Sequence, residues 1–178
     1  VMLGIKGEDA DGVVDALDFL REYNLRGSVK VGQKVVIIGG GNAAVDAART
    51  ALRLGASEVT ILYRRTREEM PAYTEEIEEA QQEGVVLKTL SAPVEVITEE
   101  NVVTGLLCCN MTLGEFDRSG RRRPEGESDN NFTIEADQVI TAIGQKVGFD
   151  EVFDGIELDL IDGKTIAADR KTGQTSVP

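Results

Sequence analysis

The chain has 178 residues, 41% of them hydrophobic, so it is long enough to bury a core of about one domain. Nineteen Lys and Arg against 32 Asp and Glu give a net charge of −13, which disfavours nucleic acid and anionic membranes as general partners. The sequence contains no His, so the commonest general base is missing and hydrolase classes lose support. Without an apolar run of 18 residues or a secretory signal pattern, we expect a cytoplasmic protein that does not span a membrane.

The predicted elements change from alternating strands and helices to strands alone. Apolar periodicity predicts a short helix at 11–23, a strand at 35–38, a helix at 43–54, a strand at 59–62, a helix at 71–84, and strands at 86–90, 93–98, 102–111, 132–136 and 138–143. The strands at 93–98 and 102–111 predict an antiparallel hairpin with a turn at 99–101. This order favours one Rossmann-like α/β domain over 1–178, with a parallel sheet, flanking helices and an inserted antiparallel β hairpin or meander.

One charged stretch and one cysteine pair interrupt this pattern. Residues 114–131 are rich in Gly, Asp, Arg and Ser, which predicts a long flexible loop, with a basic docking patch at Arg121–Arg123 as the alternative. Cys108 and Cys109 are adjacent, so they cannot form a CxxC redox pair and have no spaced partners for zinc or an iron–sulfur cluster. We interpret them as core thiols and expect no metal site in the chain.

A glycine-rich turn follows the first apolar strand. Gly39, Gly41 and Ala44 have GxGxxA spacing between a strand and an alanine-rich helix, the arrangement that places a dinucleotide pyrophosphate on the amides of a helix N-terminus. Gly39 is expected to permit the tight turn, and Gly41 to let the pyrophosphate approach bare backbone. Asn42 and Asp46 are either ligands or ordinary capping residues. The predicted cofactor-binding residues of this turn are Gly39, Gly40, Gly41, Asn42, Ala43 and Ala44.

The end of the second strand indicates which nucleotide is preferred. NAD sites normally carry Asp or Glu there, about 20 residues after the glycines, to bond the ribose 2′-hydroxyl. Here the strand is followed by Tyr63, Arg64 and Arg65, and guanidinium groups suit a 2′-phosphate instead. The sequence therefore predicts NADP(H) in preference to NAD(H), although either arginine alone is also typical of a solvated surface. Arg67 either joins them or is simply solvated.

Three segments together resemble a known family. Gly-Gly-Gly-Asn-Ala-Ala-Val-Asp, Tyr-Arg-Arg with Glu-Glu-Met-Pro-Ala, and Ala-Asp-Gln-Val-Ile-Thr-Ala-Ile-Gly-Gln are similar to motifs of the glutamate synthase small (beta) subunit family, flavoproteins with two dinucleotide-binding domains. The resemblance implies a parent oxidoreductase in which NADPH passes hydride to FAD and electrons continue to iron–sulfur centres or a large-subunit partner. It also implies that Ala142, Ile143 and Gly144 lie near the cofactors.

The resemblance covers nearly the whole chain but includes no flavin fingerprint. We therefore expect an NADP-binding domain excised from a larger flavoprotein, partnered by the flavin domain of the same parent chain, with the FAD site incomplete here and no activity in isolation. We assign no catalytic residue. A short-chain-type dehydrogenase is disfavoured because Tyr23, Tyr63 and Tyr73 lack a lysine four residues away. A nucleotide-sensing or protein-interaction module without redox activity stays open as the alternative.

Overall fold

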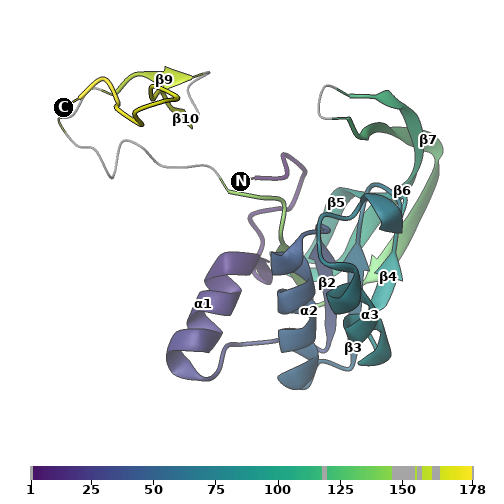
Figure 1. Cartoon of the computed structure of the whole chain (residues 1–178). Helices are drawn as coiled ribbons and strands as arrows, with labels where there is room; N and C mark the ends of the chain where they lie inside the picture. The colour runs from purple at the N-terminus through teal and green to yellow at the C-terminus, as the bar shows by residue number, and fades with distance from the viewer. Residues whose placement is uncertain (1, 118–119, 146–154, 156–157, 162–164, 178) are drawn as a thin grey trace. The chain divides into compact units, whose positions relative to one another are not determined.

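A parallel sheet organises residues 2–143 of the structure, a computed structural model that describes residues 2–117, 120–145, 155, 158–161 and 165–177. Its five strands lie in the order β1-β8-β2-β3-β4, and every neighbouring pair is parallel. Figure 1 labels three of them, β2, β3 and β4. The strands are β1 (Val13–Asp15), β8 (Gln138–Thr141), β2 (Lys34–Ile38), β3 (Glu58–Leu62) and β4 (Val86–Lys88).

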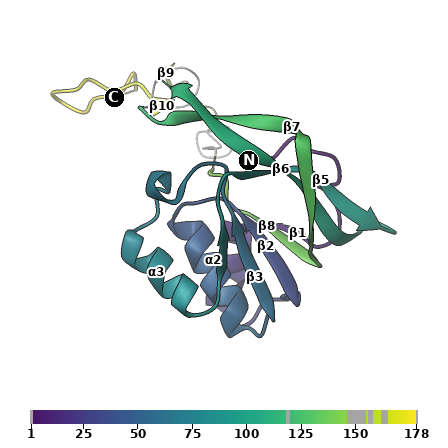
Figure 2. The ribbon, with the colours of Figure 1, turned by 90° about the vertical axis from the view of Figure 1, so that its right-hand side faces the viewer.

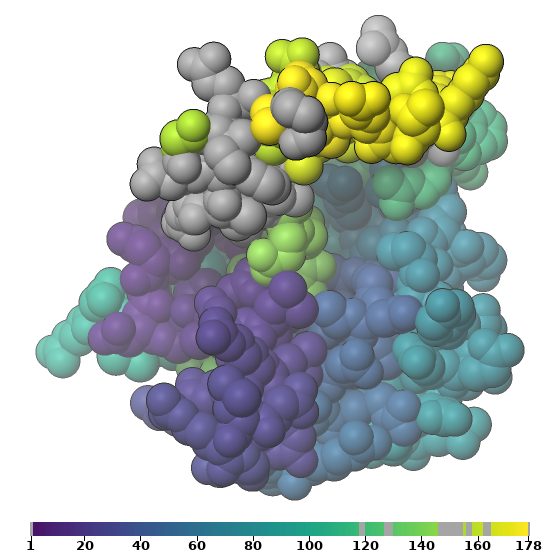
Figure 3. All heavy atoms as spheres, turned by 60° about the vertical axis from the view of Figure 1, so that its left-hand side comes forward, coloured from purple at the N-terminus to yellow at the C-terminus, as the bar shows by residue number. Residues whose placement is uncertain are grey.

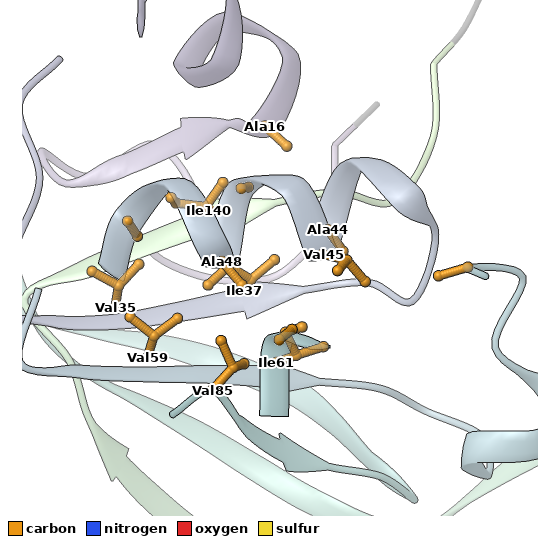
Figure 4. Close-up of a cluster of buried hydrophobic side chains, with 14 of the residues drawn as sticks. Ala16, Val35, Ile37, Ala44, Val45, Ala48, Val59, Ile61, Val85 and Ile140 are labelled. Atoms are coloured by element: carbon orange, nitrogen blue, oxygen red, sulfur yellow. The ribbon is translucent and has the colours of Figure 1, made fainter. Parts of the chain in front are cut away.

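Three helices pack on one face of this sheet. They are α1 (Ala16–Arg26), α2 (Asn42–Arg53) and α3 (Thr74–Gln82). The alanines of α2 at positions 44, 48 and 51 are fully buried in the core with the strands, which lets the helix lie close to the sheet. Figure 3 shows α1 in purple beside α2 in blue on this helical face. Figure 4 shows the resulting core, in which the fully or almost fully buried side chains include Ala44, Ala48, Val35, Ile37, Val59, Ile61 and Ile140.

A three-stranded antiparallel sheet covers the opposite face. It has the order β5-β6-β7, with β5 (Ser91–Glu99), β6 (Val102–Phe116) and β7 (Arg122–Glu135). Val36 and Ile38 of β2 lie in one core cluster with Leu106 of β6, whereas the alternate residues of β2 face the helices. Strand β2 is therefore buried on both faces, which explains its uninterrupted apolar sequence. The predicted Rossmann-like parallel sheet with an inserted antiparallel hairpin is confirmed.

The first predicted helix is wrong at its start. Val13–Asp15 forms β1 and pairs with β8, and the helix begins only at Ala16. The side chain of Asp15 caps the helix by accepting a hydrogen bond from the backbone N–H of Leu17 at 2.8 Å. Three residues are too few to show a strand period, so the helical spacing of the apolar residues that follow masked this edge strand.

Most of the predicted loop at 114–131 forms strands. Residues 111–116 of β6 pair with 122–126 of β7 beyond the end of β5, so the hairpin continues past the three-stranded part of the sheet (Figure 2). The turn includes residues 118–119, which lie outside the described residues. Charged residues occur in both strands because this part of the hairpin lacks a third strand and is largely exposed. The flexibility of the segment stays a prediction.

Gly144–Pro178 forms a second, smaller unit. Within it β9 (Leu160–Ile161) and β10 (Thr165–Ile166) form an antiparallel pair. Asp169 organises a turn, because its Oδ1 accepts hydrogen bonds from the backbone N–H groups of Lys171 and Thr172 at 2.9 and 2.8 Å. These bonds lower the pKa of the Asp169 carboxyl. The prediction that 1–178 is one domain stays a prediction.

Leu106 tests the contact between the two sheets. Its side chain is fully buried between them, so Leu106→Ala should lower the free energy of unfolding by about 2–5 kcal/mol through lost burial and a cavity. Leu25→Ala is the matched control, since Leu25 is 74% exposed on α1. Urea denaturation followed by circular dichroism measures both. Equal, small effects of the two substitutions would contradict this packing.

Candidate nucleotide site

The ends of three adjacent strands bring the predicted site residues together. Ile38 of β2 pairs with Leu62 of β3 on one side and with Thr141 of β8 on the other. The N–H of Gly39 donates to the carbonyl of Leu62 at 3.0 Å, and the N–H of Ala142 donates to that of Ile38 at 2.8 Å. The glycine turn, the arginine segment and the segment after β8 therefore meet at one edge of the sheet, where open α/β sheets bind ligands.

Gly39 and Gly40 are required by the protein itself. Gly39 has φ +150°, and a Cβ there would collide with the carbonyl group of Ala142. A Cβ on Gly40 would lie 2.5 Å from the ring of Tyr63, which is buried and donates a hydrogen bond from its hydroxyl to the carbonyl of Glu69 at 2.8 Å. These two glycines therefore permit the close contact between the turn and its neighbouring segments.

Gly41 has no such structural requirement. Its φ of −91° suits any residue, and a Cβ at this position would lie 3.9 Å from its nearest neighbour, the Cγ of Pro71. Among the described residues no hydrogen bond uses the N–H groups of Gly41, Asn42 or Ala43, at the start of α2. The first turn of α2 contains no acidic residue, so its unpaired amides and dipole favour an anion.

The segment after β3 lies against this turn. It contains a short 3-10 helix, η1 (Arg67–Glu69), and then returns toward the glycines. The N–H of Ala72 donates to the carbonyl of Gly40 at 3.1 Å, and the N–H of Tyr73 donates to Oδ1 of Asn42 at 3.1 Å. In this structure the side chain of Asn42 thus orders the neighbouring segment, and whether it also contacts a ligand stays a prediction.

Arg64 is the cation that the fold leaves available. Its side chain is exposed, and within the described part of the chain it has no hydrogen bond or ion pair. Arg67 differs, because its Nη2 lies 3.0 Å from Oε1 of Glu78 on α3. Both side chains remain accessible to solvent, but only Arg64 has a guanidinium group with every donor unused.

Arg65 is held by the hairpin. It is 4% exposed, its Nε donates to the carbonyl of Arg122 at 2.7 Å, and its Nη2 lies 3.1 Å from Oδ2 of Asp117. The sequence predicts a phosphate ligand at this position, whereas the structure directs the guanidinium to protein acceptors. Asp117 and Arg122 were not predicted as site residues, since no local spacing signals a contact between segments so far apart.

The third predicted segment begins directly after β8. Ala142 is partly buried beside the helix core, and Ile143 is exposed at 37%. Gly144 has φ +98° and is the first residue of the second unit, so its place relative to the glycine turn is not described. A ligand role for these three residues stays a prediction.

Two helices are joined by a charge cluster. Arg49 of α2 binds Glu83, which follows α3, with Nη2 donating to Oε1 at 2.5 Å and Nε donating to Oε2 at 3.0 Å. Its Nη1 also lies 3.0 Å from Oε2 of Glu79. The Arg49 guanidinium lowers the pKa of the Glu83 carboxyl, and Glu83 in turn raises the pKa of Arg49. The cluster fixes α2, whose first turn carries the unpaired amides, to α3.

The chain matches one protein family along its whole length. The family model for pyridine nucleotide-disulphide oxidoreductases matches residues 1–178. The chain belongs to this family. It is 44% identical over 168 residues, 92% of the chain, to the NADPH-Fe(3+) oxidoreductase subunit beta of Geobacter sulfurreducens, and 36% identical over 184 residues, 96% of the chain, to the glutamate synthase [NADPH] small chain of Azospirillum brasilense. The resemblance to glutamate synthase small subunits is thereby confirmed.

The relatives are longer than the chain. It covers 25% of the Geobacter protein and 38% of the Azospirillum protein. Among solved structures, the fold is similar to FprA from Mycobacterium tuberculosis in complex with NADPH, with a TM-score of 0.74 and 21% identity over 89% of this chain and 50% of that chain. No helix in the described ranges is long and apolar enough to cross a membrane, and those ranges contain no group of three metal-ligating acidic, Cys or His side chains.

The two cysteines of this chain, both free, differ in burial. Burial raises the pKa of the Cys108 thiol to about 12, and Cys109 is only partly buried on the other side of β6. Thiolates are the reactive form, so iodoacetamide at pH 8 should label native protein at Cys109 alone, and both residues after unfolding. Peptide mass spectrometry distinguishes the two sites. Labelling of Cys108 in the native state as fast as in the unfolded state would contradict this.

The two glycines of the fingerprint should respond differently to alanine. Gly39→Ala should lower the free energy of unfolding by about 2–4 kcal/mol, because it combines a backbone collision with an unfavourable φ. Gly41→Ala should lower it by less than about 1 kcal/mol, the usual difference between Gly and Ala at a helix N-cap. Urea denaturation compares them. If Gly41→Ala were as destabilising as Gly39→Ala, Gly41 would be a packing residue.

Proposed function

We propose that this chain binds NADP(H) across the edge formed by β8, β2 and β3. The observation that carries the proposal is the combination at this edge of an unobstructed Gly41 backbone, unpaired amides at the start of α2, and an unpaired Arg64 after β3. The amides suit the pyrophosphate, and the guanidinium suits a 2′-phosphate that NADP(H) has and NAD(H) lacks. In this proposal Gly39 and Gly40 shape the turn, and Ala43 and Ala44 lie in the first turn of α2.

We propose a direction for the bound nucleotide, which the order of the strands supports. A 2′-phosphate at Arg64 places the adenosine half at the β3 end, and the pyrophosphate then crosses the glycine turn after β2. The nicotinamide half extends toward the end of β8, where Ala142 and Ile143 follow the strand. This direction supports the role in the cofactor site that the family resemblance implies for the segment starting at Ala142.

The proposed role of the chain is to position the nicotinamide for hydride transfer to FAD. The redox chemistry belongs to the two cofactors, and the protein contributes their orientation and the exclusion of competing reactions. Since the chain spans about a quarter to two fifths of the relatives named above, we place the flavin site largely in the remaining part of such a protein. The names of those relatives include "subunit beta" and "small chain", so we propose that electrons leave the flavin for a partner subunit.

Arg64 provides the direct test of the nucleotide assignment. Arg64→Ala should weaken NADPH binding by about 10- to 150-fold, the equivalent of one charged hydrogen bond of about 1.5–3 kcal/mol, and leave NADH binding unchanged. Calorimetric titration measures both affinities. Arg26→Ala is the matched control, because it removes the same charge from an exposed ion pair at the far end of α1. Equal affinities of the unaltered protein for NADPH and NADH would refute the 2′-phosphate assignment.

A further inference from the structure

We propose that Arg65 is a positioning residue, which clamps the outer part of the β6–β7 hairpin to the end of β3 and so fixes Arg64 for the 2′-phosphate. The proposal rests on the NADP(H) function proposed above and assigns two further residues, Asp117 and Arg122, to nucleotide selectivity. It departs from the sequence-based expectation that both arginines contact phosphate.

Two nitrogens of the Arg65 guanidinium are already bonded to the hairpin. Its Nε donates to the backbone carbonyl of Arg122 at 2.7 Å, and its Nη2 pairs with Asp117 at 3.1 Å. Only 4% of Arg65 is exposed, so these two acceptors stabilise a buried positive charge. Turning the side chain to a ligand would break both bonds and separate the buried Arg65 cation from Asp117, which is costly for a charge that is out of water.

Asp117 is itself placed by the hairpin. Its N–H donates to the carbonyl of Arg121 at 2.7 Å, and its Oδ1 accepts from the N–H of Arg121 at 3.2 Å. One carboxylate oxygen thus closes the hairpin, while the other reaches Arg65. The Asp117 carboxylate therefore holds the hairpin and the segment that contains Arg64 and Arg65 in a fixed relative position.

The same part of the hairpin also contacts η1. The N–H of Arg122 donates to Oε1 of Glu69 at 3.2 Å, and Nη2 of Arg122 donates to the carbonyl of Leu113 at 3.0 Å. The segment between β3 and α3 is consequently attached to the hairpin at two places, Arg65 and Glu69. Arg64 lies between these attachments and the buried Tyr63, so its backbone is fixed from both sides.

A further attachment joins Arg65 to Met111 of β6 through Leu90, the residue before β5. The N–H of Leu90 donates to the carbonyl of Arg65 at 3.0 Å, and the N–H of Met111 donates to the carbonyl of Leu90 at 2.8 Å. Leu90 adopts φ +49°, a conformation that non-glycine residues rarely adopt. The backbone of Arg65 is thus bonded to Leu90, directly before β5, and its side chain is bonded to the hairpin, while the neighbouring Arg64 is exposed.

A thermodynamic cycle distinguishes a clamp from a second ligand. The quantity measured is the ratio of NADPH to NADH affinity, by calorimetric titration of the purified protein in its natural full length. We expect the ratio to fall about 5-fold in Arg65→Met and equally in Asp117→Asn. The ratio of the double variant should be no lower than that of either single variant, because both changes remove the same interaction. In an Arg64→Ala background neither change should alter the ratio further, since the residue that they position is gone.

The opposite results identify a direct ligand. If Asp117→Asn leaves the ratio unchanged or raises it, the clamp is refuted. If Arg64→Ala and Arg65→Met multiply their losses, Arg65 binds the phosphate itself and the clamp is likewise refuted. Should Arg65→Met fail to fold, Asp117→Asn alone decides, because this carboxylate is partly exposed. Glu125→Gln is the matched control, an exposed carboxylate of the same hairpin, and should leave the ratio unchanged.

The same data separate failure of the clamp from failure of the proposed function. If the unaltered protein does not prefer NADPH, the NADP(H) assignment itself is wrong. If it prefers NADPH and Arg64→Ala abolishes the preference, but the Arg65 and Asp117 variants do not follow the cycle, only the clamp is wrong.

Discussion

The candidate site depends on one constraint, the close parallel pairing of β2 with β3 and β8. Ile38 lies in register with Leu62 and Thr141, and the chain leaves all three strands at the same edge. A Cβ at Gly39 would force the turn after β2 away from Ala142. The pyrophosphate turn, the arginine segment and the segment after β8 are therefore assembled by backbone pairing and by the absence of one side chain.

Each layer around the sheet supplies a different part of the site. The helical layer brings the unpaired amides of α2, held against α3 by the Arg49–Glu83 pair. The antiparallel layer holds the arginine segment from the opposite side through Arg65 and Asp117. This division explains why the outer half of a charged hairpin, which contributes little to the core, is bonded to the segment that carries Arg64.

The sequence predicts features that lie within one short segment, but it does not predict contacts between segments that are far apart in the chain. GxGxxA spacing located the turn because the whole pattern lies within one strand–turn–helix unit. It could not separate Gly41, which the protein leaves open, from Gly40, which accommodates Tyr63. Likewise, two adjacent arginines are equivalent in the sequence pattern, and only the return of the hairpin shows that Arg65 is buried while Arg64 is free. The sequence does not predict β1, the short strand before α1, because three residues are too few to show the two-residue period of a strand.

We propose that one sheet edge holds NADP(H), with its 2′-phosphate at Arg64 and its pyrophosphate on the amides of α2. A crystal structure of the protein with NADP⁺ bound tests this most directly. We expect the pyrophosphate within hydrogen-bond distance of the N–H groups at positions 41–43 and the 2′-phosphate on Arg64, with Arg65 still bonded to Asp117. A nucleotide bound elsewhere, or a 2′-phosphate that does not contact Arg64, would contradict it.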